Sequence, residues 1–142
     1  MEFSNEFFAR IIVFEGFRNK AYKCAAGVWT IGYGTTLNVK EGMVITSTQA
    51  FNLLKEDAQR LSDNINNLGV AFNQNQFDAV GLLCYNIGFS AFKRSTLFSV
   101  IKKNHNDRQI YNLWNKWVYC KGQALQGLVN RRQSEVNLYF SM

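Results

Sequence analysis

The sequence predicts an α+β domain that is mostly helical and has two lobes. Alternating side chains, typical of a β-hairpin, occur only within residues 17–37, and a long amphipathic helix is predicted after them, over about 46–70. With 142 residues, of which 47% are apolar and 18% charged, the chain can fold as one domain around its own core. We expect a small lobe over about 15–45 and a helical lobe over about 71–142, which packs with a first helix at 4–14.

The first helix brings Glu15 to its C-terminal end, between two phenylalanines. A carboxyl group at the edge of a core is partly desolvated, which disfavours its charged form, and the partial negative charge of the helix end acts in the same direction. A carboxyl that keeps its proton can serve as a general acid. The plainer interpretation is an exposed glutamate at a helix end.

Residues 17–37 predict a hairpin in which Trp29, Ile31 and Tyr33 alternate with Thr30, Gly32 and Gly34. We expect the bulky face to pack and the Thr/Gly face to be bare, which would suit close approach of a ligand. If Cys24 pairs with Val28, Cys24 and Thr30 lie on one face, roughly 7–8 Å apart. The alternative is that both are ordinary hairpin residues.

The long helix starts at Thr46, which forms a capping box with Gln49. Its apolar residues recur at helical spacing: Phe51, Leu54, Ala58, Leu61, Ile65 and Leu68. The apolar segment 75–88 predicts a central buried helix, with Cys84 as a small hydrophobe. A further helix is expected over 107–120, with Cys120 at its end.

The net charge of +6 is concentrated in residues 93–132, which hold nine Lys or Arg against the single acid Asp107. Such a segment attracts a polyanion: nucleic acid, a membrane surface or bacterial cell wall. One alternative function is therefore a basic helical nucleic-acid-binding domain that uses Trp114, Trp117 and Tyr119. Against this, Trp114 and Trp117 are three apart on one predicted helix face, which favours packing.

Four ordered motifs resemble the phage-type lysozymes, the muramidase family of the T4 and lambdoid endolysins. Glu15, Cys24 and Thr30 have the spacing of that family's signature E-x8-D/C-x5-T. The segment GVWTIGYGTT is similar to G-x-x-T-I-G-Y-G-H-T, and the stretches from Gln76 to Lys103 and from Gly127 to Tyr139 match two further motifs. The resemblance runs from about residue 6 to residue 140.

The resemblance implies a lysozyme-like fold with a cleft between the lobes, and hydrolysis of the β-1,4 bond between N-acetylmuramic acid and N-acetylglucosamine in peptidoglycan. Glu15 would be the general acid, Cys24 would occupy the position of the family's Asp, and Thr30 would help to position the attacking water. The family is regarded as inverting. It uses no cofactor or metal, and no ligand cluster in this sequence argues for one.

Two positions depart from the family pattern. The first is Cys24, a variant that the signature allows in place of Asp. A free cysteine has a pKa of about 8.5, so a thiolate at Cys24 would need a neighbour such as Lys20 or Lys23 to lower that pKa. Thr35 stands where the family usually has His, which supports the site. These changes leave a second alternative open, an inactive lysozyme fold that only binds cell wall.

The sequence shows neither a signal peptide nor a membrane-spanning segment. We therefore expect synthesis in the bacterial cytoplasm and action at the cell wall after release, with peptidoglycan as partner and no nucleic acid. The family resemblance implies a monomer without a membrane anchor, whose release depends on a separate holin.

Overall fold

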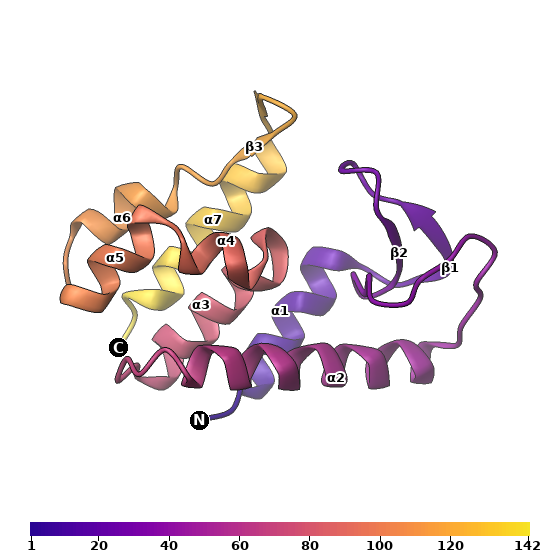
Figure 1. Ribbon diagram of the computed structural model, residues 1–142, viewed down its shortest axis with the longest axis horizontal. Helices are drawn as coiled ribbons and strands as arrows, with labels where there is room; N and C mark the ends of the chain where they lie inside the picture. Colours follow the sequence, from indigo (N-terminus) through magenta and orange to yellow (C-terminus); the bar gives the residue numbers. More distant parts are fainter.

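The computed structural model describes all residues, 1–142, and has the predicted mostly helical α+β fold (Figure 1). In chain order the elements are α1 (Asn5–Glu15), β1 (Arg18–Lys23), β2 (Trp29–Gly32), α2 (Ser47–Asn66), α3 (Gln74–Ile87), α4 (Phe89–Lys93), α5 (Thr96–Lys103), α6 (Gln109–Trp114), β3 (Tyr119–Cys120), β4 (Gln123–Ala124) and α7 (Gln126–Tyr139). The β1–β2 hairpin lies at one end, α3–α7 gather at the other, and α2 runs alongside both. None of the helices combines the length and the apolar character needed to cross a membrane.

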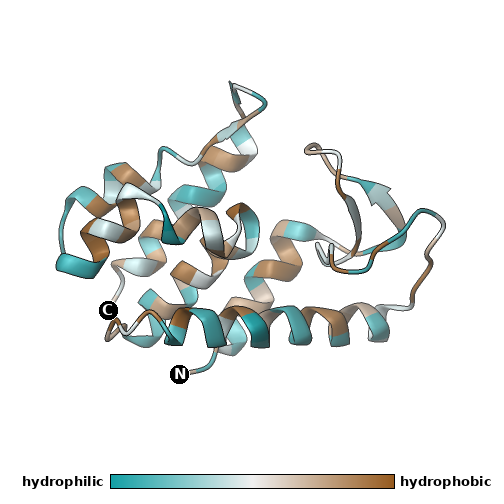
Figure 2. Cartoon of the chain, viewed as in Figure 1, coloured by the Kyte–Doolittle hydropathy of each residue, from teal (hydrophilic) through white to brown (hydrophobic).

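Helix α2 begins with the predicted capping box. The Thr46 hydroxyl accepts from the backbone N–H of Gln49 at 3.1 Å, and the Gln49 side chain accepts from the backbone N–H of Thr46 at 2.8 Å. Hydrophobic and hydrophilic residues alternate along α2 at helical spacing (Figure 2). The buried members of its apolar stripe are Leu54, Ala58, Leu61 and Ile65, whereas Phe51 remains exposed. The stripe is therefore core, as its spacing predicts.

The hydrophobic core is built around α3, where every residue from Gln76 to Cys84 is buried. It joins α1, α2 and α3 to the C-terminal helices through a cluster of 22 buried residues. None of the 22 belongs to residues 16–45. The large apolar side chains thus gather in the helical part, and the hairpin segment contributes little to the core.

The β1–β2 hairpin has the expected pairing, but the prediction of a bare face is wrong. Tyr22 pairs with Thr30, and beyond the strand end the Cys24 N–H donates to the Val28 carbonyl at 3.0 Å. Thr30 is only 4% exposed. A Cβ at Gly32 would lie 3.1 Å from the Cβ of Ala50. Helix α2, rather than a ligand, approaches this glycine.

The predicted helix at 107–120 is shorter than expected. It ends at Trp114, which is fully buried, so Trp117 lies beyond the helix. Cys120 belongs to strand β3 instead of a helix end. The turn between β3 and β4 contains Lys121 and Gly122 at φ of 51° and 81°, the positive values that a two-residue hairpin favours.

Candidate active site

Glu15 is the last residue of α1, and its side chain is 19% exposed. Its Oε1 lies 3.0 Å from Nη1 of Arg131, which comes from α7 and is itself 9% exposed. The Arg131 guanidinium also lies 4.8 Å from the centre of the Phe14 ring. Glu15 is thus partly desolvated as expected, and it is paired with a cation that local sequence reasoning missed.

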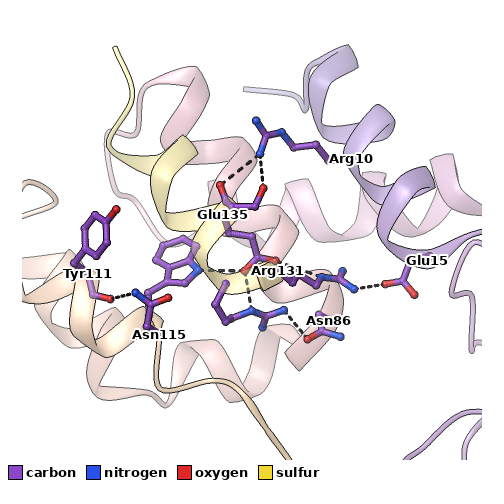
Figure 3. A network of polar contacts seen from close by, with 10 residues as sticks. Arg10, Glu15, Asn86, Tyr111, Asn115, Arg131 and Glu135 are labelled. Carbon is purple, nitrogen blue, oxygen red and sulfur yellow. Dashed lines mark hydrogen bonds and ion pairs between the residues drawn. The ribbon is translucent and has the colours of Figure 1, made fainter. Parts of the chain in front are cut away.

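Arg131 is fixed by a buried charge network on α7 (Figure 3). Glu135, which is 0% exposed, lies 3.4 Å from Nε of Arg131 and 3.0 Å from Nε of Arg132. The Trp114 indole donates to the same carboxylate at 3.1 Å. Burial lowers the pKa of Arg132 to about 10 and raises the pKa of Glu135, although both guanidinium groups oppose the second shift. Glu15 is therefore attached to the rigid interior of the helical part.

The loop after β2 holds Glu15 from the other side. Gly34 has φ of 85°, and a Cβ there would lie 2.9 Å from Oε2 of Glu15. The Tyr85 hydroxyl, from α3, donates to the Tyr33 carbonyl at 2.6 Å. The short distance to Glu15 and the positive φ together explain why residue 34 is a glycine.

Thr35, at the position where the resemblance leads us to expect His, is 2% exposed and bonds to α2. Its hydroxyl donates to Oδ2 of Asp57 at 2.8 Å. Burial raises the pKa of Asp57, and the Thr35 hydrogen bond and the charge of Arg60 partly offset that shift. A neutral hydrogen-bond donor therefore anchors the loop to α2.

Cys24 lies directly after β1, and the pKa of its thiol is lowered from the usual value. The main cause is a hydrogen bond from the backbone of Val28; the backbones of Ala26 and Gly27 and the Thr30 side chain add to it, and burial opposes it. The Thr30 hydroxyl also lies 2.9 Å from the Val28 carbonyl, to which it donates. The turn backbone, rather than Lys20 or Lys23, thus favours the thiolate.

Tyr22 connects the two candidate groups in space. Burial is the main reason why the pKa of its phenol is raised, and the charges of Glu15 and Cys24 raise it further. Tyr22 pairs directly with Thr30 across the hairpin. Cys24 and Thr30 therefore lie together on the hairpin, and Glu15 is near enough to Tyr22 for its charge to act on the same phenol.

Two cavities open in this region. One, of about 740 Å³, extends from Cys24 at the hairpin tip to the segment between α6 and α7. It is lined mainly by apolar residues, including Ile87, Trp117 and Leu128. The other, of about 270 Å³, is lined by residues that include Gly34, Asp57 and Arg60. No group of three or more His, Cys, Asp or Glu is arranged to hold a metal ion.

Sequence reasoning from the local pattern missed the partners of Glu15. The signal for Arg131 and Glu135 was their separation of four residues, which places both on one face of a helix. Asp57 and Tyr85 gave no such signal, because each reaches the site from a distant segment. Their roles depend on how α2 and α3 pack.

The fold and the comparison with known proteins together define the class, a glycoside hydrolase of the lysozyme type. The sequence matches the Phage lysozyme family over residues 13–135. It is 42% identical over 134 residues to the endolysin of Acyrthosiphon pisum secondary endosymbiont phage 1, covering 90% of each chain. It is 38% identical over 149 aligned positions to the endolysin of Salmonella phage P22, covering 99% of each.

Solved structures agree with these relatives. The muramidase domain of SpmX from Asticaccaulis excentricus superimposes with a TM-score of 0.87 at 32% identity, covering 99% of each chain. An endolysin from Escherichia coli O157:H7 phage FAHEc1 gives a TM-score of 0.84 at 34% identity, covering 99% of this chain and 94% of that one. The chain belongs to the phage lysozyme family, and it is a peptidoglycan-hydrolysing enzyme of the endolysin type.

Proposed function

We propose that Glu15 is the general acid, that Cys24 acts as a thiolate in place of the second carboxylate, and that Thr30 positions the attacking water. The contact between Glu15 and Arg131 supports the first role, because it fixes the carboxyl group at the end of α1. The lowered pKa of the Cys24 thiol supports the second. The hydrogen bond between the Thr30 hydroxyl and the Cys24 thiol supports the third.

In the proposed reaction, Glu15 gives its proton to the glycosidic oxygen as the bond to the anomeric carbon breaks. Water attacks that carbon from the opposite face, so the configuration inverts. The Cys24 thiolate accepts the proton of the water; if the thiolate instead stabilises positive charge on the sugar, that proton passes to solvent. Glycosidases commonly use two carboxyl groups for these tasks, and this site combines one carboxyl with one thiol.

The single observation that carries the proposal is the enclosure of Glu15 between Arg131 and Gly34. We expect Glu15→Gln to lower the release of reducing ends from purified peptidoglycan by about 10²–10⁴-fold, because the acid is removed and the shape is kept. A variant that clears peptidoglycan as fast as the native protein would contradict this role. If neither protein clears the wall but both bind it, the site only binds cell wall.

The chain is further proposed to act as a monomer on the cell wall, without nucleic acid as a partner, after release by a separate holin. This follows from the family resemblance. Size-exclusion chromatography tests the monomer. Expression in a bacterial cytoplasm with and without a membrane pore tests the release, and lysis that needs no pore would contradict it.

A further inference from the structure

The cavity beside Cys24 contains a side-chain amide that the catalytic roles do not use. Asn86, near the C-terminal end of α3, is exposed and lines this cavity together with Cys24 and Trp117. Its Oδ1 accepts a hydrogen bond from Nη2 of Arg132 at 2.7 Å. Figure 3 shows Asn86 next to the buried network of α7, which therefore holds this amide in place.

Arg132 fixes which way the amide points. A guanidinium group only donates hydrogen bonds, so the oxygen of Asn86 must face Arg132 and the NH₂ group must face away. Arg132 is 0% exposed and is held 3.0 Å from Glu135, so it does not turn aside to release the amide. The Asn86 nitrogen thus presents donors at the cavity wall without an acceptor from the protein.

The rest of the lining defines what these donors would meet. Nine of the eleven lining residues are hydrophobic, and Lys116 is the other polar one. A ligand that fits has an apolar surface for residues such as Trp117 and a neutral carbonyl oxygen for the amide. The acetamido group of an N-acetylated sugar has both, because its methyl is apolar and its carbonyl is an acceptor.

We propose that Asn86 is a specificity-determining residue that donates to the acetamido carbonyl of a sugar bound in the cavity beside Cys24. Arg132 is the positioning residue that keeps the amide nitrogen directed at the sugar. The proposal rests on the chain acting on an N-acetylated glycan and is independent of the roles assigned to Glu15, Cys24 and Thr30. The cavity at Gly34 has a different chemistry, because its lining includes the charged pair Asp57 and Arg60.

The test is binding, measured in the Glu15→Gln protein so that no bond is cleaved. Asn86→Asp keeps the shape of the side chain and its acceptor for Arg132, but it replaces the NH₂ donor by an acceptor. We expect it to bind soluble, uncross-linked peptidoglycan strands at least roughly tenfold more weakly, with an unchanged midpoint of unfolding. Asn112→Asp, at an exposed position of α6, makes the same charge change as the matched control and should bind normally.

A second arm tests the chemical class with a β-1,4-linked tetramer of N-acetylglucosamine and the corresponding tetramer of glucose. The protein with Asn86 should prefer the acetylated tetramer, by tryptophan fluorescence, and Asn86→Asp should lose that preference. Equal binding of the two tetramers, including no binding of either, would overturn the proposal. So would peptidoglycan binding by Asn86→Asp that matches the control. Loss of hydrolysis in Glu15→Gln alone bears only on the proposed acid.

Discussion

Glu15 is held from two sides that are built very differently. On the helical side, Arg131 belongs to a network with Glu135 and Arg132 that is almost fully removed from water. On the hairpin side, Gly34 contributes only backbone, and Cys24 sits near an exposed turn. Four side chains of residues 16–45 are buried: Ala21, Thr30, Ile31 and Thr35.

The contrast indicates a division of tasks. The helical side fixes the acid through charges that cannot be solvated, so a defect there should first affect stability. The hairpin side supplies the thiol and the hydroxyl with little core of its own, so a defect there should first affect the reaction. Each substitution below tests whether stability and activity separate in this way.

The largest effect on stability is expected from Glu135→Gln. It leaves the fully buried Arg132 without a counter-charge and leaves Arg131 with Glu15 alone, and breaking a buried ion pair in this way costs about 3–5 kcal/mol. Urea unfolding measures the loss. Glu41→Gln, at an exposed position of the hairpin side, is the matched control and should stay within about 0.5 kcal/mol of the native protein. Equal losses in both variants would remove the contrast.

Gly34→Ala should affect activity more than its effect on stability suggests. The positive φ destabilises an alanine by about 1–2 kcal/mol. In addition, its Cβ would push against the Glu15 carboxylate, so hydrolysis should fall at least roughly tenfold. Gly42→Ala has nearly the same φ, 86°, with no atom near the new methyl. If both variants lose the same activity, displacement of Glu15 is not the cause.

Thr35→Val should have the smallest effect, a loss of about 1 kcal/mol, because the partly buried Asp57 carboxylate loses the Thr35 donor and keeps only Arg60. The hydrogen bond to Thr35 favours the charged form of Asp57, whose pKa is raised by burial. The contribution of Thr35 is therefore present above that raised pKa and weakens as the pH falls through it. Urea midpoints across pH measure this, with exposed Thr36→Val as control. A difference that grows on acidification would contradict the assignment.

The sequence was sufficient for those elements whose signals are local. The capping box at Thr46 and the spacing along α2 predict a helix because both depend on residues within a few turns. The hairpin register at Cys24 and Val28 followed in the same way. The resemblance then placed Glu15, Cys24 and Thr30, whose catalytic roles stay predictions.

The sequence was not sufficient where distant segments decide the outcome. The Thr/Gly face was expected to be bare, but α2 covers it at Gly32, and no local pattern reveals which helix packs there. The partners of Glu15 and Thr35 come from α7 and α2. The hairpin turn at Lys121 and Gly122 was missed, because the spacing of Trp114 and Trp117 predicted a helix that continues to Cys120.

The central claim is that the hairpin side supplies the second ionisable group as the Cys24 thiolate. The most direct measurement is the rate of reducing-end release from peptidoglycan against pH for the native protein, Cys24→Asp and Cys24→Ser. Native activity should rise with pH through the lowered pKa of the thiol, because the thiolate is the active form. Cys24→Asp should be active without that rise, and Cys24→Ser should lose about 10²-fold or more at every pH. A serine variant that matches the native rate and its pH profile would contradict the claim.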